Sequence, residues 1–361
     1  MNKLLKVFRS IFIGLAILVV AFLILIWAIT FHPSDTKEVS VVCDKDAPIL
    51  QSGDAIKSLT YNVQYMAGKN YVFYYDLPND AGPDERPSAE DITATLEEVA
   101  RIIEDENPDF ILLQEVDDGS KRTDNEDQLA RLLVLLPDEY KCHASAFYWK
   151  AGFVPHPRIM GAIGHKISII SKYRIETAVR YQLPIHSSDP LTQQFSPKRA
   201  ILETRLPVED GDDFILLTTH LEVANRGPEI KQQEIAKINE VLKSIDQAGN
   251  PWLLGGDFNL LPPGGYEFLW DGQQNNFREV SEIGPLFDSY NVFPSLEEVT
   301  GDNPENWFTM FINDPSVPEL DRTVDYFFYS DNLILTKAHV RNNDTLTISD
   351  HLPVIAEFTL P

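Results

Sequence analysis

The chain begins with one long apolar run. Residues 10–31 contain no charged side chain and consist mostly of Ile, Leu, Val, Phe and Ala. At about 1.5 Å of rise per helical residue, this run spans roughly 33 Å, close to the thickness of the hydrocarbon core of a bilayer. The pattern predicts a transmembrane helix, and with the residues before it an anchor over residues 1–31.

The charges beside this run predict its orientation. Lys3, Lys6 and Arg9 precede it, whereas the residues that follow are mixed in charge. The positive-inside rule then places the N-terminus in the cytoplasm and the rest of the chain outside, in the periplasm or the extracellular space. A cleaved signal peptide is the alternative, but the run is longer than a typical signal-peptide core and no Ala-x-Ala-like site follows it. We therefore favour an uncleaved single-pass anchor, with the bilayer as its partner.

Beyond the anchor, the pattern predicts a linker and then one domain. Residues 32–54 mix prolines, polar residues and short apolar stretches without a period, which is typical of a linker. Over residues 55–361, apolar stretches typical of strands alternate with helical stripes, and no second linker divides them. This alternation by itself predicts an α/β fold.

The predicted elements are short. Strands are expected at 56–63, 110–113, 167–170, 214–218, 252–254, 323–329 and 353–359. Helices are expected from Ser88 onward, over 126–136 and around 235–245. Two long stretches, 143–165 and 284–316, are rich in Pro, Gly and aromatic residues and are expected to be irregular loops.

Composition indicates a folded, acidic protein. Hydrophobic residues make up 43% of the 361 residues, enough to fill a large core despite a formal charge of −25. The two cysteines, Cys43 and Cys142, exclude a four-cysteine zinc site, and they either form a disulfide or remain two buried thiols. An acidic surface repels phosphate backbones and anionic lipid, which weakens any interpretation as a nucleic-acid-binding protein.

Polar side chains lie at the ends of nearly all the predicted strands. They are Asn62, Gln114, Glu115, His220, Asp257, Asn259, Asp325, Asp350 and His351. Each of them alone has a structural explanation, as a turn residue, a solvated strand end, a core histidine or a cap. Together they supply hard oxygen ligands suited to Mg²⁺ or Mn²⁺ and two histidines that titrate near neutral pH. The set predicts a metal-assisted catalytic site.

Six short blocks around these residues occur in a recognisable order. They are Leu59 to Gln64, Asp109 to Val116, Thr219 to Leu221, Gly255 to Asn259, Val324 to Tyr326 and Ser349 to Val354. The ordered set resembles the endonuclease/exonuclease/phosphatase superfamily over roughly residues 55–359. The resemblance implies a four-layer α/β/β/α sandwich, in which two mostly antiparallel sheets pack face to face. The segment Gly164 to Lys172 departs from it, because bulky residues precede its Ser-Lys ending.

The resemblance also implies a metal site and a histidine beside it. Glu115, Asn62 and Asp350 would bind the Mg²⁺ or Mn²⁺ ion. His351 would contact the scissile phosphate as a general base or an electrostatic clamp. Asp325 would hold His351, because a carboxylate fixes the tautomer of an imidazole and favours its protonated form.

Three further roles follow from the resemblance. Asp257 would orient or deprotonate the attacking water, and Asn259 would position the phosphate or the water. His220 would stabilise the transition state or protonate the leaving group. Lys198 and Arg199 either bind a substrate phosphate or form an ordinary solvated strand end.

The anchor and the acidic body favour one substrate class. We expect a membrane-tethered phosphoesterase that hydrolyses phosphodiesters outside the cytoplasm, with lipid headgroups or small molecules preferred over nucleic acid. An exported endonuclease or exonuclease is the alternative, because a net charge can conceal a local basic groove. A non-catalytic binding protein would be expected to lack some of the site residues, yet all of them are present. No protein partner is predicted, and phosphomonoesters remain open as substrates.

Aromatic residues are concentrated in the two long stretches. They include Phe147, Tyr148, Trp149, Phe153, Trp307 and Phe308. These side chains either approach a membrane interface, line a pocket or pack as ordinary core beneath the loops, and we favour core packing.

Overall fold

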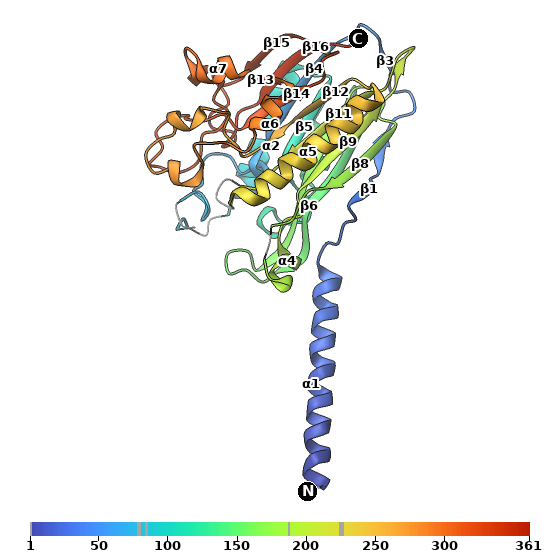
Figure 1. The fold of residues 1–361 in the computed structure, drawn as a ribbon, viewed down its shortest axis with the longest axis vertical. Helices are drawn as coiled ribbons and strands as arrows, with labels where there is room; N and C mark the ends of the chain where they lie inside the picture. The colour runs from blue at the N-terminus through green and yellow to red at the C-terminus, as the bar shows by residue number, and fades with distance from the viewer. Residues whose placement is uncertain (1, 78–80, 84–85, 187, 224–226) are drawn as a thin grey trace.

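The computed structural model describes residues 2–77, 81–83, 86–186, 188–223 and 227–361. A long N-terminal helix, α1 (Asn2–Ile29), projects from one end of a folded domain (Figure 1). Most of its side chains are exposed, and the segment Leu5–Ile29 has a mean hydropathy of 3.1. Since lipid tails would cover these side chains at no hydrophobic cost, the helix could span a membrane, although a signal sequence has the same properties.

The domain contains two large sheets. The strands of the first are β2 (Val41–Cys43), β4 (Ala55–Asn62), β5 (Phe110–Asp117), β6 (Cys142–Val154), β7 (Gly161–Ser171), β15 (Ile334–Val340) and β16 (Val354–Thr359). Those of the second are β1 (Thr36–Glu38), β8 (Thr177–Gln182), β9 (Ala200–Leu206), β11 (Phe214–His220), β12 (Trp252–Asp257), β13 (Asn291–Phe293) and β14 (Asp325–Tyr329). A small separate ribbon pairs β3 (Leu50–Gln51) with β10 (Val208–Glu209).

Each large sheet has one parallel pair at its centre. The first sheet runs β15-β16-β4-β5-β7-β6-β2, and only its β4–β5 pairing is parallel among the described strands. The second runs β1-β8-β9-β11-β12-β14-β13, with β11 and β12 parallel. Helix α2 (Ala89–Glu106) connects β4 to β5, and helix α5 (Pro228–Ala248) connects β11 to β12. Each sheet therefore contains the same unit, a parallel pair of central strands connected by a helix.

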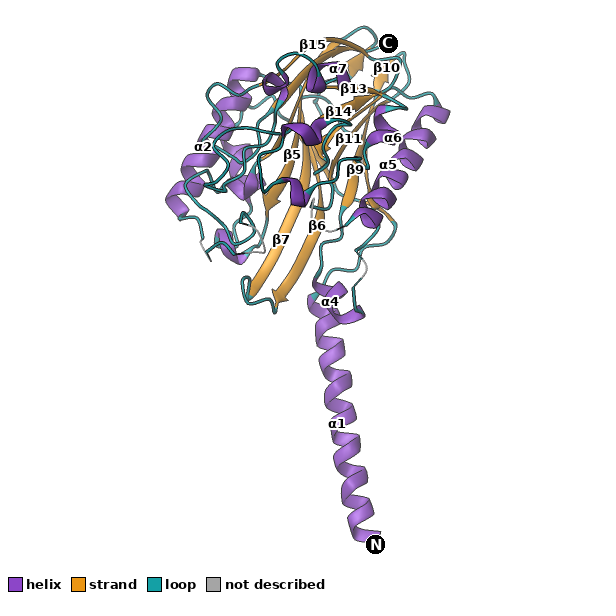
Figure 2. Cartoon of the chain, turned by 60° about the vertical axis from the view of Figure 1, so that its left-hand side comes forward, coloured by secondary structure: helices purple, strands orange, loops and turns teal. Residues whose placement is uncertain are grey.

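The two sheets pack face to face, with helices on the outside (Figure 2). Along β5, Phe110 and Leu112 point into the core between the sheets, where Phe110 lies 5.7 Å from Phe214 between ring centroids. The alternate residues Ile111 and Leu113 pack instead with the apolar stripe of α2. This alternation with period two buries both faces of the strand. The predicted α/β/β/α sandwich is confirmed.

Helix α2 forms where the sequence predicts it. The Ser88 hydroxyl accepts a hydrogen bond from the Asp91 N–H at 3.0 Å, which satisfies a free donor of the first turn. At the other end, Asn107 adopts the left-handed conformation that ends many helices. The shorter helices are α3 (Gln128–Leu135), α4 (Pro190–Phe195), α6 (Gly284–Phe287) and α7 (Leu296–Thr300).

Two sequence-based expectations are corrected by the structure. The prediction of an irregular loop over 143–165 is wrong, because this stretch forms most of β6 and the start of β7. The inward positions of β6 include Ala144 and Ala146, whose small side chains give a weak hydrophobic pattern. Residues 32–54, expected to be a linker, contribute the edge strands β1 and β2, so the folded domain begins before residue 55.

The two cysteines, whose pairing the sequence leaves open, form a disulfide. Cys43 on β2 is bonded to Cys142 on β6, directly opposite each other in the antiparallel ladder. The bond ties the segment after the anchor to the edge of the first sheet.

Candidate active site

The carboxyl ends of the four central strands meet at one end of the sandwich. Asn62 ends β4, Glu115 lies near the end of β5, and His220 and Asp257 end β11 and β12. A hydrogen bond joins the two sheets here, because the side-chain amide of Asn62 donates to Oδ2 of Asp257 at 3.0 Å. The sequence-predicted residues of both halves are thus brought together.

Asp257 lies at the centre of this group. The Gly-Gly pair before it lets β12 lie close to β11, since a Cβ on Gly256 would come within 2.2 Å of the Thr219 carbonyl oxygen. The carboxylate of Asp257 accepts the N–H of Asn259 at 2.8 Å, and Asn259 has a left-handed φ of 51°, which Asn tolerates better than most residues. Burial raises the pKa of Asp257 to about 7, opposed by the nearby charge of His351.

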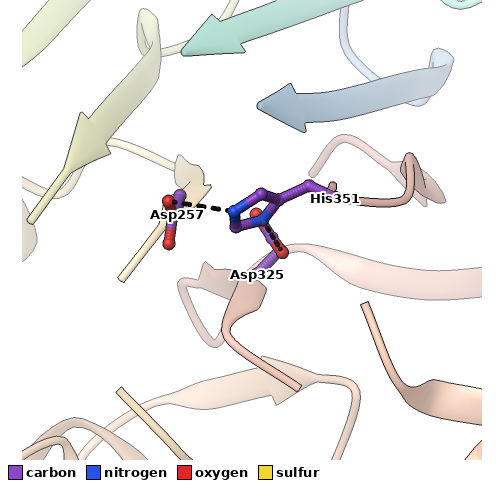
Figure 3. A group of neighbouring side chains, drawn as sticks. All are labelled: Asp257, Asp325 and His351. Carbon is purple, nitrogen blue, oxygen red and sulfur yellow. Dashed lines mark hydrogen bonds and ion pairs between the residues drawn. The ribbon is translucent and has the colours of Figure 1, made fainter. Parts of the chain in front are cut away.

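His351 contacts two of the site's carboxylates (Figure 3). Its Nδ1 lies 2.8 Å from Oδ2 of Asp325, and its Nε2 lies 3.6 Å from Oδ2 of Asp257. Asp325 is itself oriented by Thr309, whose hydroxyl accepts the Asp325 N–H at 3.1 Å. Burial alone would lower the pKa of His351, but the charges of Asp325 and Asp257 outweigh it and raise that pKa well above its usual value. The two carboxylates therefore favour the protonated form of His351.

The pKa of His220 is shifted in the opposite direction. Its Nε2 lies 3.3 Å from Oδ2 of Asp257 and 3.8 Å from Oε1 of Glu115. Burial, and then the positive charges of Arg199 and His351, lower the pKa of His220 well below its usual value. Two buried histidines whose pKa values are shifted in opposite directions thus flank Asp257, and pKa values pushed apart in this way are typical of acid–base sites.

Glu115 is the most open of these carboxylates. Its side chain is 22% exposed, against 1% for Asp257. It has a left-handed φ of 59° and lies in a register shift between β5 and β7, and such bulges re-aim side chains near active sites. Burial raises the pKa of Asp350, and the charge of Glu115 raises it further. A divalent cation with oxygen ligands would offset the effect of the Glu115 charge on Asp350, so these two carboxylates fit such an ion.

The structure offers two sets of metal ligands. Beside the expected set of Glu115, Asn62 and Asp350, single ligand atoms of Asp257, Asp325 and His351 lie within 4.8 Å of one another. In the expected set, the side-chain oxygen of Asn62 already accepts the N–H of Gln64 at 3.0 Å. In the second set, Nδ1 of His351 and Oδ2 of Asp325 are already engaged with each other, whereas Oδ1 of Asp325 has no hydrogen-bond partner among the described residues.

Lys198 and Arg199, neighbours in sequence, have different surroundings. The ammonium of Lys198 donates to three backbone carbonyls, those of Gln193, Gln194 and Ser196, at 3.0–3.1 Å. The guanidinium of Arg199 lies 4.9 Å from the centre of the Tyr148 ring, and its Nε and Nη1 are buried without a hydrogen-bond partner among the described residues. Arg199 therefore has donors left for an anion, whereas Lys198 uses its donors to hold the end of α4.

A buried network beside the site was not predicted from the sequence. Tyr148, whose ring meets that of His220 edge-on at 5.3 Å, hydrogen-bonds His165 through its hydroxyl. His165 Nε2 lies 2.9 Å from Asp117, which also accepts from Arg122 at 2.9 Å. The signal in the sequence was the bulky segment after Gly164, which breaks the small-residue pattern of that strand.

Comparison with known proteins agrees with the fold and the order of the site residues. A profile of the endonuclease/exonuclease/phosphatase family matches residues 59–351. No curated protein matches the chain significantly.

Solved structures with a similar fold include two bacterial proteins of this kind and one human protein. An endonuclease/exonuclease/phosphatase from Beutenbergia cavernae DSM 12333 has a TM-score of 0.58 and 21% identity, covering 85% of this chain and 72% of that one. One from Bacteroides vulgatus has a TM-score of 0.53 and 16% identity, covering 85% and 100%. The human Nocturnin catalytic domain with bound sulfate has a TM-score of 0.51 and 17% identity, covering 90% and 98%. At these identities the similarity concerns the fold.

Proposed function

The chain belongs to the endonuclease/exonuclease/phosphatase family, and on that basis we propose that it is a membrane-tethered, divalent-metal-dependent phosphodiesterase that acts outside the cytoplasm. The observation that carries the proposal is the buried cluster in which Nε2 of His220 and Nε2 of His351 lie 3.3 and 3.6 Å from Oδ2 of Asp257, with the pKa values of the two histidines shifted in opposite directions. Hydrolysis of a phosphodiester needs an activated water on one side of the phosphorus and stabilisation of the charge that gathers on the phosphoryl oxygens. The residues around Asp257 include candidates both for activating the water and for stabilising the charge on the phosphoryl oxygens.

Asp257 is the residue best suited to activate the water. Its pKa, raised to about 7, matches the pH at which a general base works most efficiently. The amide of Asn62 and the N–H of Asn259 hold its two oxygens in place, so that the orientation of the carboxylate is fixed before substrate binds.

His351 is then an electrostatic clamp on the phosphate. As an imidazolium oriented by Asp325, it presents Nε2 as a charged donor near Asp257. His220, whose Nε2 lies 3.3 Å from Oδ2 of Asp257, can donate or accept one hydrogen bond when neutral. Arg199, whose guanidinium lies 4.9 Å from the centre of the Tyr148 ring, has two nitrogens without a partner among the described residues. These positive and neutral donors face the position where an anionic transition state gathers charge.

Glu115 and Asp350 are the residues that would hold the metal ion. A bound Mg²⁺ or Mn²⁺ would act as a Lewis acid on a phosphoryl oxygen. The openness of Glu115, together with the raised pKa of Asp350, supports this assignment over the Asp257, Asp325 and His351 group. In that group the hydrogen bond at 2.8 Å already engages His351 and Asp325.

Lipid headgroups are our preferred substrate, ahead of small phosphodiesters. The apolar helix α1 supports membrane attachment, and a net charge of −25 opposes the binding of long nucleic acid. A nuclease is the second candidate, since the family's own description includes nucleases.

The test uses the full chain in lipid nanodiscs. Phospholipids, supercoiled DNA and a soluble nitrophenyl diester are supplied with Mg²⁺ or with EDTA. His351→Ala is compared with His339→Ala, which alters a half-exposed histidine on β15 that pairs with Glu106. Headgroup release that requires both Mg²⁺ and His351 would support the proposal. DNA nicking with the same requirements would make the protein a nuclease, and hydrolysis that His351→Ala leaves unchanged would refute the assigned site.

A further inference from the structure

The active site lies at the end of the domain from which α1 emerges. Thr30, just after α1, forms a β-bridge with Ala151 of β6. Two residues earlier on β6, Trp149 is paired with His165 of β7, and His165 is paired with Asp117 at the end of β5. At about 4.8 Å between neighbouring strands, β5 lies only ~15 Å across the sheet from the end of the anchor. Along the strands, Asp117 is displaced by two residues, or ~7 Å.

In the second sheet, too, the strand ends that carry site residues lie near the end of α1. The backbone N–H of Gln182, at the end of β8, donates to the carbonyl of Asp35 at 2.8 Å. The guanidinium of Arg180 lies 5.5 Å from the centre of the Phe31 ring. Because β8 is antiparallel to β9 and β9 to β11, this end of β8 is also the end at which His220 lies. The carboxyl ends of all four central strands therefore point toward the membrane end of the molecule.

Apolar side chains are exposed beside the end of α1. The tip of the β6–β7 hairpin, residues 152–160, and helix α4 lie at the level where α1 meets the domain in both views (Figures 1 and 2). Phe153 and Met160 on the hairpin tip are 40% and 50% exposed, and Leu191 on α4 is 45% exposed. Gly152 adjoins α1, since a Cβ there would lie 3.7 Å from Ile29. We call the hairpin tip and α4 together the membrane-facing end.

The β6–β7 hairpin and the residues beside it are less acidic than the chain as a whole. Residues 141–175 contain no Asp or Glu, although the chain as a whole has 55 of them. The same stretch contains Lys141, Lys150, Arg158, Lys166, Lys172 and Arg174. Of these, only Lys150 and Arg158 lie toward the hairpin tip, because Cys142 pairs with Ser171 at the other end of the hairpin and Lys166 is ion-paired with Asp118 and Asp127. The expectation that the acidic protein repels anionic lipid therefore does not extend to residues 150–160, which contain these two basic residues and no acid, because basic residues near a bilayer favour anionic headgroups.

We propose that the membrane-facing end lies in the headgroup layer of the bilayer that holds α1, so that the active site takes its phosphodiester from a lipid in the same leaflet. The exposed apolar residues and the lack of acidic residues in the hairpin fit a lipid surface. The position of the catalytic residues, on the same end and close to the anchor, brings the site to the level of the headgroups. The choice of substrate rests on the proposed phosphodiesterase function, whereas the contact with the bilayer does not.

The contact between the membrane-facing end and the bilayer can be tested by measuring how deeply its residues lie in the membrane, without any assay of enzymatic activity. Nitroxide labels are attached to Phe153→Cys and to Leu191→Cys in full-length protein in nanodiscs, with Ile334→Cys as the control. Ile334 is an apolar residue, 63% exposed, at the start of β15, which lies at the opposite end of the domain (Figure 1). The native cysteines do not react with the label, because they are paired.

The expected result is that oxygen collides with labels 153 and 191 more often, relative to a water-soluble nickel complex, than with label 334. Equal collision ratios at all three positions would overturn the contact. For the substrate, the double variant Phe153→Asp/Leu191→Asp should lower the ratio of lipid to soluble-diester turnover about tenfold relative to Ile334→Asp. If the double variant leaves the ratio of lipid to soluble-diester turnover unchanged, lipid is not the substrate taken at this end of the domain. Absence of turnover on every diester would refute the phosphodiesterase instead, while the label depths would still decide the contact.

Discussion

Nδ1 of His351 and Oδ2 of Asp325 are 2.8 Å apart and almost completely buried. This pair links the last block of site residues to strand β14, and the charge of Asp325, together with that of Asp257, raises the pKa of His351 well above its usual value. An imidazolium held in this way has its orientation fixed before any substrate binds, because folding has already ordered the ring.

Replacing Asp325 should therefore impair turnover more than folding. We expect Asp325→Asn to lower kcat by about 10²–10⁴-fold, because the imidazole loses the partner that orients it and stabilises its charge. The matched control is Asp331→Asn, which alters an exposed acid on the turn after β14. Circular dichroism and kcat on a soluble diester check the two effects, and a folded Asp325→Asn protein with normal kcat would contradict the assigned role.

Lys198 and Arg199 provide a second prediction from adjacent residues. Arg199→Lys should raise KM or lower kcat on a diester about tenfold or more, because Nε and Nη1 of the guanidinium, which have no partner among the described residues, are lost, while Nη2 lies 3.8 Å from Glu222. Lys198→Met should instead lower the melting temperature, because three backbone carbonyls lose their donor, and should change KM little. Steady-state kinetics and thermal unfolding of both variants separate the roles, and a larger KM change for Lys198→Met would reverse them.

Much of the fold could be predicted from the sequence, and so could most of the residues that the structure brings together around Asp257. Strand positions followed from short apolar stretches, and the site residues followed from the polar positions at strand ends. The direction in which the strands pair could not be predicted, because an apolar stretch such as residues 110–113 has the same pattern in parallel and antiparallel sheets. The sandwich came from the resemblance of the ordered blocks.

What the sequence missed has physical causes. Strand β6 was not predicted because several of its buried positions are alanines. Alanine gives only a weak hydrophobic signal in a sequence, so the alternation of buried and exposed positions along this strand was not recognised. The Tyr148–His165–Asp117 network depends on the pairing of β5, β6 and β7, so residues far apart in the chain meet only in the folded sheet. The orientation of the site toward α1 depends on the same strand pairings.

Metal binding is predicted to depend on Glu115. We expect Glu115→Gln to raise the Mn²⁺ concentration for half-saturation by about tenfold or more, since one charged oxygen ligand is lost. Glu126→Gln, which alters a partly exposed acid paired with Arg131, should leave Mn²⁺ binding unchanged. The electron paramagnetic resonance signal of free Mn²⁺ measures both, and equal affinities would favour the Asp257, Asp325 and His351 group as the metal site.

Stability should decrease with pH through a buried carboxyl on α5. Burial, and then the charge of Glu222, raise the pKa of Glu234 to about 8. Between the ordinary value for Glu and pH 8, the folded chain holds a proton that the unfolded chain has lost, so stability falls as pH rises through this window. Glu234→Gln should then be more stable than the wild type by roughly 1–3 kcal/mol at pH 8.5, and by much less at pH 5. Urea unfolding at both pH values checks this, and a difference that does not grow with pH would show that Glu234 is charged in the folded protein.

The disulfide should contribute to stability because it closes a long loop. Cys43 and Cys142 are 99 residues apart, and the loss of such a cross-link typically costs about 2–5 kcal/mol. A reducing agent should lower the melting temperature of the wild type and leave that of Cys43→Ser/Cys142→Ser unchanged. If reduction leaves the melting temperature of the wild type unchanged, the bond adds nothing to stability.

The most direct test of the central claim is the hydrolysis of a soluble phosphodiester by the full chain, measured with Mg²⁺, with EDTA and with His351→Ala. A soluble diester removes any dependence on the membrane, so the measurement concerns only the chemistry of the site around Asp257. The account predicts product release that is lost in EDTA and reduced by about 10²-fold or more in His351→Ala. Hydrolysis that persists without metal, or that His351→Ala leaves intact, would contradict it.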